Sequence, residues 1–357
     1  MGFQNWEKSE KVDIQMSIDV VMANYNQGHL ISNAINCLNK QKLLATKIFI
    51  IDDSSTDNSV NILQDLTSRF KNIYLILNER NLGATICYSI GLKQVKSEFV
   101  YFAAADDETY PNLFELSIAY LQLFPNAPFS CAEVLVKEGI HKKESYRPVA
   151  RPQQISGYLT PKKVIKKFKY TDNWILTGTC IYRTNMLKSY ETAKPLLEGF
   201  SDSVLAKKIA LTEGCVFLKY VGVKWNVSYH GVSRGMFKNF QKFSSIKMIL
   251  KNEISNSKEF PPSYWKKFSS RLDFTYYRFE IEKSIRNQTN LISNKHFRLL
   301  DNLINEFNSL SKLYKNILIL GIFIKFRPYS IRYLINTGIH RKLEQFNKNQ
   351  KQSNFFT

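Results

Sequence analysis

Two adjacent carboxylates, Asp106 and Asp107, stand where an apolar stretch ends. The residues Phe99 to Ala103 have mostly β-forming side chains and predict a strand that runs through small residues into the two acids. Neighbouring carboxylates repel each other, so a cation or a hydrogen-bonding ligand that shares the site would stabilise them. The same acids also suit a polar turn before a helix that starts near Pro111. These residues alone favour neither interpretation.

Two further polar segments follow apolar stretches earlier in the chain. Asn24 to Asn26 come after the apolar run Ile18–Ala23, and Asp52 to Asp57 come after Lys47–Ile51. In an open parallel sheet, ligands bind beyond the carboxyl ends of the strands. One acidic loop after a strand is ordinary, whereas three polar segments at one edge of a sheet indicate a ligand site.

Strand and helix patterns alternate through this part of the chain. Apolar residues recur with helical spacing in Leu30–Leu38, Ile62–Phe70 and Gly83–Val95, and Ile73–Leu77 is a further predicted strand. The alternation predicts an α/β fold with a doubly wound, mostly parallel sheet. The chain has no GxGxxG and no GxxxxGK[ST] motif, so dinucleotide and P-loop sites lose their main support.

The composition is that of a globular protein with unevenly placed charge. Of 357 residues, 44% are apolar and 13% aromatic, and no apolar run reaches the length of a transmembrane helix. Residues 1–125 contain 10 basic and 14 acidic side chains, and the remainder contains 40 and 16, so the net charge of +20 lies in the later part. The N-terminus lacks the apolar core of a secretory signal, and the five scattered cysteines fit neither a disulfide framework nor a zinc cluster. We therefore expect a cytoplasmic protein with reduced thiols.

Four segments resemble the nucleotide-sugar domain of glycosyltransferase family 2, whose members have the GT-A fold. The segments are VMANYNQ and IIDDSSTDNS after the first two strands, NERNLGATICYSIGL before the fourth, and FAAADD at its end. Their order and spacing agree across Ser17 to Phe124. The resemblance implies a Rossmann-like GT-A domain over residues 17–235, with a nucleotide-sugar half (17–125) and an acceptor half (126–235). Residues 1–16 would be an N-terminal extension, and residues 236–357 a mainly α-helical, basic C-terminal region.

The resemblance also implies a donor site. In the family, the acid after the second strand contacts the base and ribose, which matches Asp52 or Asp53. The glycine at position 83 matches the family's loop beside the base, where the backbone approaches the ligand closely, although a helix-start turn explains it equally well. The residues implied in nucleotide-sugar binding are Asn24, Asn26, Asp52, Asp53, Arg80, Asn81, Gly83 and Asp106.

The resemblance also implies a divalent cation, Mn²⁺ or Mg²⁺, as a cofactor. The family's motif reads Asp-x-Asp-Asp, and this chain has Ala104-Ala105-Asp106-Asp107, so an alanine replaces the first acid. Asp106 matches the residue that holds the cation against the diphosphate, and such a cation needs only one or two protein carboxylates. Asp107 and His230 are further candidate ligands, although a lone histidine in a mixed loop is commonly structural.

Asp202 is the candidate catalytic base. In the family, this region carries a Glu-Asp pair at a helix start, and here the pair reads Ser201-Asp202. A carboxylate at this place would take the proton of the acceptor hydroxyl as its oxygen attacks the anomeric carbon. The alternative is a helix cap, because an acid at a helix start is stabilising without any chemistry.

The resemblance thus implies an inverting glycosyltransferase of the hexosyl or N-acetylhexosaminyl type. It would move a sugar from a nucleotide diphosphate, most commonly uridine diphosphate, to a hydroxyl of a glycan or lipid-linked acceptor in surface polysaccharide or lipopolysaccharide synthesis. A degenerate GT-A domain that binds a sugar nucleotide or a partner without turnover is one alternative, since Ala104 and Ser201 stand in place of acids. A nucleic-acid-binding protein is another, suggested by the basic charge and the many aromatic residues.

The C-terminal region is also a candidate membrane contact. Ile317–Ile324 is apolar but short, and cations and aromatic residues flank it. It would either dock the enzyme on an anionic membrane surface at the inner face of the membrane, or pack as a buried helix in a small bundle.

Overall fold

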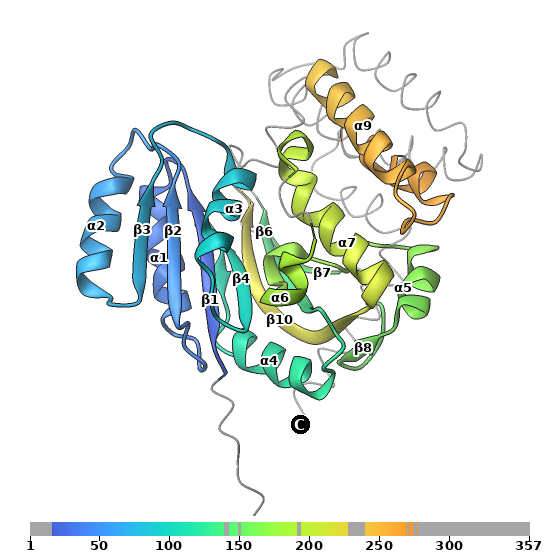
Figure 1. Cartoon of the computed structure of the whole chain (residues 1–357), viewed down its shortest axis with the longest axis horizontal. Coiled ribbons are helices and arrows are strands. Elements are labelled where there is room, and N and C mark those ends of the chain that lie inside the picture. Colours follow the sequence, from blue (N-terminus) through green and yellow to red (C-terminus); the bar gives the residue numbers. More distant parts are fainter. Residues whose placement is uncertain are drawn as a thin grey trace, which may run out of the picture.

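A ten-stranded mixed sheet forms the centre of the molecule (Figure 1). The computed structural model describes residues 16–138, 143–148, 151–190, 194–227, 240–269, 271–273 and 276. The strands lie in the order β3-β2-β1-β4-β9-β6-β10-β5, with β7 beside β6 and β8 beside β10. The pairs β1–β2, β2–β3, β1–β4 and β6–β10 are parallel, which confirms the predicted mostly parallel α/β sheet.

The described elements follow one another along the chain as strand and helix. The strands are β1 (Ile18–Asn24), β2 (Lys47–Asp52), β3 (Ile73–Leu77), β4 (Phe99–Ala104), β5 (Glu108–Thr109), β6 (Phe129–Glu138), β7 (Lys143–Arg147), β8 (Gly157–Leu159), β9 (Ile181–Arg183) and β10 (Cys215–Val227). The α-helices are α1 (Gly28–Leu38), α2 (Ser59–Arg69), α3 (Ala84–Gln94), α4 (Leu113–Leu123), α5 (Pro161–Phe168), α6 (Thr184–Lys188), α7 (Ser201–Glu213) and α9 (Phe240–Ser255). Two 3₁₀ helices, η1 (Thr177–Thr179) and η2 (Pro195–Phe200), complete the set.

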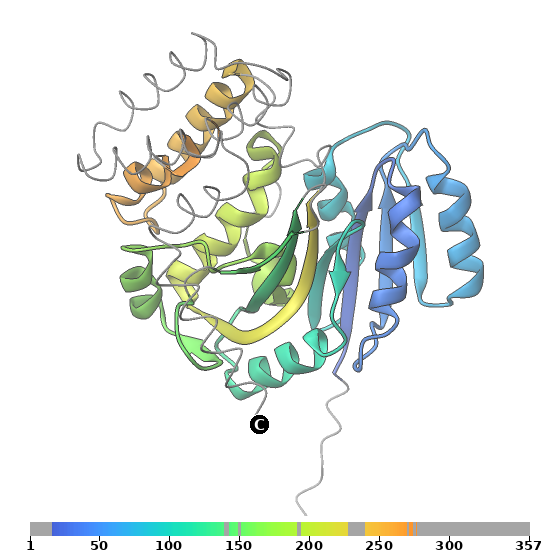
Figure 2. The same cartoon turned by 180° about the vertical axis from the view of Figure 1, so that it is seen from behind.

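Helices cover both faces of the sheet (Figures 1 and 2). Alternate residues of β1 point to opposite sides, so Val20 packs in one core with α1, α2 and α4, and Val21 packs in the other with α3 and α7. This two-sided burial explains why β1 and β2 are continuous apolar runs. Within the described residues, we find no helix with the length and apolarity needed to cross a membrane.

The second half of the sheet differs from the expectation in detail. The stretch after Lys137, which shows little pattern in sequence, contains β7, β8 and α5. The residues Cys215–Val227 form one long strand, β10. Its register against β6 shifts on both sides of Val221, and such bulges interrupt the alternation of apolar residues from which strand ends are read.

The described C-terminal helices share a core with the sheet. Leu250 of α9 and the side chains of Tyr264 and Phe268 belong to the same buried cluster as Trp174 and Phe217. The part of the expected helical region beyond residue 276, with the apolar segment 317–324, lies outside the described residues, as do residues 1–15. The boundary expected at residue 235 stays a prediction, although no break in packing separates α9 from the sheet.

Candidate active site

The carboxyl ends of β1, β2 and β4 meet at one edge of the sheet. Asn24 pairs in register with Asp52 on one side, and Ala23 pairs with Ala104 on the other. The structure therefore brings together the three polar segments that follow these strands.

Asp52 is buried beneath this edge and holds the loop that follows it. Its Oδ2 accepts hydrogen bonds from Asn24 Nδ2 and from Ser55 Oγ, both at 2.7 Å, and its Oδ1 accepts one from the Ser55 amide at 2.9 Å. Both carboxylate oxygens of Asp52 thus already accept hydrogen bonds within the protein. Asn24 Oδ1 is buried without a hydrogen-bond partner among the described residues, which leaves one unsatisfied acceptor in the floor of the site.

Asn26 organises the same loop from the other side. Its Oδ1 accepts hydrogen bonds from the amides of Thr56 (2.7 Å) and Asp57 (3.2 Å), while its own backbone has the left-handed φ of 54° that asparagine tolerates. Asp57 in turn accepts from the amides of Gly28 and Ser59. Burial disfavours ionisation of Asp57, but these hydrogen bonds outweigh it and hold its pKa below the usual value.

Asp53 anchors the segment that precedes α3. Its Oδ1 accepts hydrogen bonds from Asn78 Nδ2 (2.8 Å) and from the Leu82 amide (2.9 Å), and its Oδ2 accepts one from the Gly83 amide at 2.8 Å. Burial opposes the charge, yet these donors lower the pKa of Asp53. In this structure Asp53 therefore positions the loop that carries Arg80.

The loop itself faces solvent. The side chains of Arg80 and Asn81 are exposed. Gly83 has φ +87°, which favours glycine, and a Cβ at this position would meet no atom within 4 Å. Gly83 is the N-cap residue of α3, which agrees with the helix-start explanation. The approach of a ligand to its backbone stays a prediction, and the space in front of it is open.

Asp106 and Asp107 form a concentration of negative charge after β4. Burial raises the pKa of Asp106, and burial together with the neighbouring Asp106 raises that of Asp107 well above its usual value. Asn226 of β10 steadies the turn, since its Nδ2 donates to the Asp106 carbonyl at 3.0 Å. Because the pKa values of both acids are raised and the two residues are adjacent, a cation at this place would stabilise their ionised forms.

The acids of this turn fit a hard divalent cation by their donor chemistry. Such a cation takes oxygen ligands and retains waters, so one or two carboxylates suffice. No group of three or more acid, histidine or cysteine side chains that could hold a metal occurs among the residues that the structure describes. His230, the third expected ligand, lies outside the described residues.

Asp202 lies in the first turn of α7 with its side chain open to solvent. Its Oδ2 accepts a hydrogen bond from Thr177 Oγ of η1 and its Oδ1 accepts one from the Ser203 amide, each at 2.6 Å. The surrounding protein desolvates the carboxylate and raises its pKa, although both hydrogen bonds and Lys207 act in the opposite sense. The acid is thus not the cap of α7, whose N-cap residue is Phe200, but it accepts an amide hydrogen bond in the first turn and retains basicity.

Tyr88 of α3 lies beside the end of β4, just before Asp106 and Asp107. Its hydroxyl donates to the Ala103 carbonyl at 3.2 Å. Its pKa is raised first by burial and then by the charges of Asp202, Asp106 and Asp107. The sequence does not single out Tyr88 or Thr177 as site residues. Tyr88 differs from its apolar neighbours in α3 only by its hydroxyl, and Thr177 is one hydroxyl residue in a turn of small residues.

Comparison with known proteins decides the family. The model of the family described as Glycosyl transferase family 2 matches residues 19–189. These residues form a glycosyltransferase family 2 domain. The match confirms the resemblance seen over Ser17 to Phe124 and extends it through β9 and α6, whereas Asp202 lies beyond the matched residues.

Curated relatives of this glycosyltransferase domain share part of their length with it. An Escherichia coli protein named UDP-Glc:alpha-D-GlcNAc-diphosphoundecaprenol beta-1,3-glucosyltransferase WfgD is 30% identical over 105 residues, which are 29% of this chain and 40% of the relative. The chain spans between 28% and 41% of the length of the curated relatives that it matches.

Two solved structures show the same GT-A fold. S. aureus TarS 1–349 in complex with UDP is 20% identical, with a TM-score of 0.53 over 92% of this chain and 86% of that one. The mannosyltransferase PcManGT from Pyrobaculum calidifontis, in complex with GDP-Man and Mn²⁺, is 12% identical, with a TM-score of 0.53 over 91% of this chain and 85% of that one.

Proposed function

We propose that this glycosyltransferase transfers a hexosyl or N-acetylhexosaminyl group from a uridine diphosphate sugar to a hydroxyl of a glycan or lipid-linked acceptor, with inversion at the anomeric carbon. The observation that carries the proposal is that α3 contacts both groups of acids through their neighbours. The Tyr88 hydroxyl donates to the Ala103 carbonyl at 3.2 Å, just before Asp106 and Asp107, and the Thr85 hydroxyl donates to the Glu198 carbonyl at 3.4 Å, just before the helix of Asp202. Acids for the donor diphosphate and a base for the acceptor thus share one site.

The proposed reaction is a single displacement. Asp202 takes the proton of the acceptor hydroxyl while that oxygen forms a bond to the anomeric carbon, and the bond from this carbon to the diphosphate oxygen breaks on the opposite side. The electron pair leaves with the nucleoside diphosphate. A divalent cation held by Asp106 and Asp107 would neutralise charge on the departing diphosphate. No covalent intermediate is needed, so catalysis rests on positioning and electrostatics.

The relatives support the chemical classes involved. TarS was solved with UDP and PcManGT with Mn²⁺, and the name of WfgD describes a lipid diphosphate acceptor. On this basis we assign the exposed Arg80 and Asn81, the backbone beside Gly83 and the Asn24 amide oxygen to the nucleotide. Asp52 and Asp53 would act mainly by holding these groups in place.

A thermal-shift panel tests the donor site. The wild-type protein and Asp106→Ala are measured with nucleotides and nucleotide sugars, with Mn²⁺, Mg²⁺ or chelator. A ligand present at a hundred times its dissociation constant stabilises by about 2.7 kcal/mol, which is readily measured. We expect a metal-dependent shift with a uridine diphosphate sugar that is lost in Asp106→Ala. The absence of any shift with all nucleotides would contradict the proposal.

A further inference from the structure

Helix α7, which carries Asp202, contacts the described C-terminal residues through ion pairs and a cation–π contact. Three groups of ion pairs connect η2, the residue before it and α7 to α9 and to Arg271. Figure 1 shows α9 beside α7. The sequence predicts a separate basic extension in this region, and its contact with the helix of the candidate base is not expected from the sequence.

The innermost group centres on Asp172, whose side chain is fully buried. Lys207 of α7 lies 3.3 Å from one of its oxygens, Arg271 lies 2.5 Å from the other, and the Tyr264 hydroxyl also donates to it. A buried carboxylate is costly unless it is paired on all sides, and removal of one partner of such a cluster is strongly destabilising. The pairing also lowers the pKa of Asp172 against the effect of burial. The cluster therefore fixes Lys207.

A continuous line of contacts leads from this cluster to the candidate base. Lys207 Nζ donates to Ser203 Oγ at 2.9 Å, and the Ser203 amide donates to Asp202 Oδ1 at 2.6 Å. Phe268 reinforces the line, because Lys207 and Arg271 both lie over its ring, at 5.4 Å and 5.9 Å from the centroid. Each step is a direct contact.

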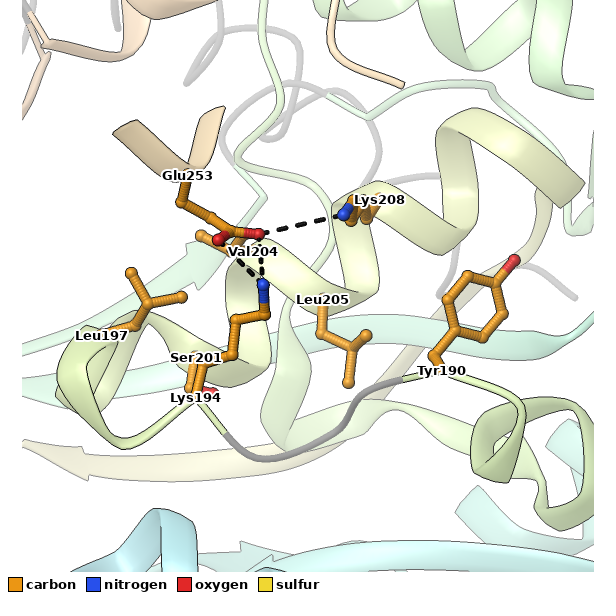
Figure 3. Close-up of a pocket in the computed structure, with 8 residues that line it drawn as sticks. All are labelled: Tyr190, Lys194, Leu197, Ser201, Val204, Leu205, Lys208 and Glu253. Atoms are coloured by element: carbon orange, nitrogen blue, oxygen red, sulfur yellow. Dashed lines mark hydrogen bonds and ion pairs between the residues drawn. The ribbon is translucent and has the colours of Figure 1, made fainter. Parts of the chain in front are cut away.

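The two outer groups hold η2 and the middle of α7. Glu253 of α9 receives Lys194 at 2.8 Å and Lys208 at 3.8 Å above a small cavity lined by Val204 and Leu205 (Figure 3). The Nζ atom of Lys242 in α9 lies 3.0 Å from the carboxylate of Glu198, which is four residues before Asp202. Glu198 has φ 44°, a strained value for a residue other than glycine, so the chain entering α7 keeps its shape only while its surroundings hold it.

We propose that Arg271 is a positioning residue for the transfer reaction, acting through Asp172 and Lys207 to fix the first turn of α7 and thereby Asp202. This inference rests on the proposed function for its kinetic part only. Its structural part, that Arg271 orders the first turn of α7, stands without any activity.

The test compares two variants that each remove one basic partner from the C-terminal helices. Arg271→Met breaks the contact to Asp172, whereas the control Lys247→Met breaks the 2.6 Å pair with Asp273, which does not reach α7. In Arg271→Met, we expect hydrogen exchange of amides in residues 197–206 to rise about tenfold or more. We also expect kcat to fall about tenfold while the donor KM stays within about twofold, since the donor acids lie on the other half. Arg271→Lys should recover part of the exchange protection of residues 197–206 and part of kcat.

The outcomes are distinct. If Arg271→Met leaves exchange in residues 197–206 like that of Lys247→Met, the proposal is wrong. Should Arg271→Met fail to fold, Tyr264→Phe removes only the hydroxyl that donates to Asp172, and it must raise exchange in the same residues. Full transfer by Asp202→Asn would overturn the proposed function and leave the exchange result intact.

Discussion

Asp202 carries the chemical prediction at the scale of single residues. As a base, it must be ionised to take a proton, so kcat/KM should fall as the pH drops through its raised pKa. Asp202→Asn should lower kcat by about 10²–10⁴ and leave the thermal shift with donor unchanged. A variant that loses donor binding and turnover together would instead indicate a structural role.

The Thr177 hydroxyl tunes this base. Thr177, the Ser203 amide and Lys207 lower the pKa of Asp202, against the raising effect of desolvation by the protein around this solvent-accessible side chain. Thr177→Val removes one donor to the ionised carboxylate and so raises its pKa further. We expect the acidic limb of the kcat/KM profile to move to higher pH than in the wild type. A limb that stays in place or moves to lower pH would contradict this assignment.

Glu198 is a strained residue whose strain is measurable. Its φ of 44° and ψ of −129° suit glycine, and its side chain pairs with Lys242. Glu198→Gly and Glu198→Ala both lose the ion pair, but only glycine relieves the backbone. Glycine should therefore be more stable than alanine by about 1 kcal/mol or more in denaturant unfolding, the reverse of the usual order. Equal stability would show that the backbone is not strained.

At the scale of elements, α3 approaches the sheet closely enough to require a small residue. A Cβ on Gly91 would lie 2.2 Å from Val21 Cγ1 and 2.8 Å from Ile51 Cδ1, both in buried strands. Helix propensity alone predicts that Gly91→Ala stabilises α3 by about 1 kcal/mol. We expect net destabilisation of about 1–3 kcal/mol from overpacking instead, while Ser89→Ala on the same helix stays near neutral. Chemical denaturation of both variants decides the sign.

At the scale of the whole molecule, α9 and the sheet should unfold together. Leu250 of α9 is fully buried in the cluster that also contains Val21 of β1. Leu250→Ala should lower the free energy of unfolding by about 2–5 kcal/mol and reduce hydrogen-exchange protection of the slowest β1 amides accordingly. Loss of protection in α9 with β1 unchanged would show that the helix is a separate unit.

The sequence by itself determined the part of the fold in which neighbours along the chain are also neighbours in space. The strands β1 to β4 and helices α1 to α3 begin and end within three residues of their expected bounds, because burial on both faces of a parallel sheet leaves a periodic pattern in the local sequence. The alternation and the polar residues after the strands predict a site at one edge of the sheet. The family was predicted separately, from the resemblance of four segments to glycosyltransferase family 2.

Only the tertiary structure decided which polar groups are engaged and which face outward. Asp52 and Asp53 look alike in sequence to ligand-binding acids, yet their partners Ser55, Leu82 and Gly83 show them holding loops. The contact of Arg271 with Asp172 joins residues almost a hundred positions apart. No periodicity encodes such pairs, because burial and hydrogen bonding at one residue depend on distant segments that meet only when the chain has folded.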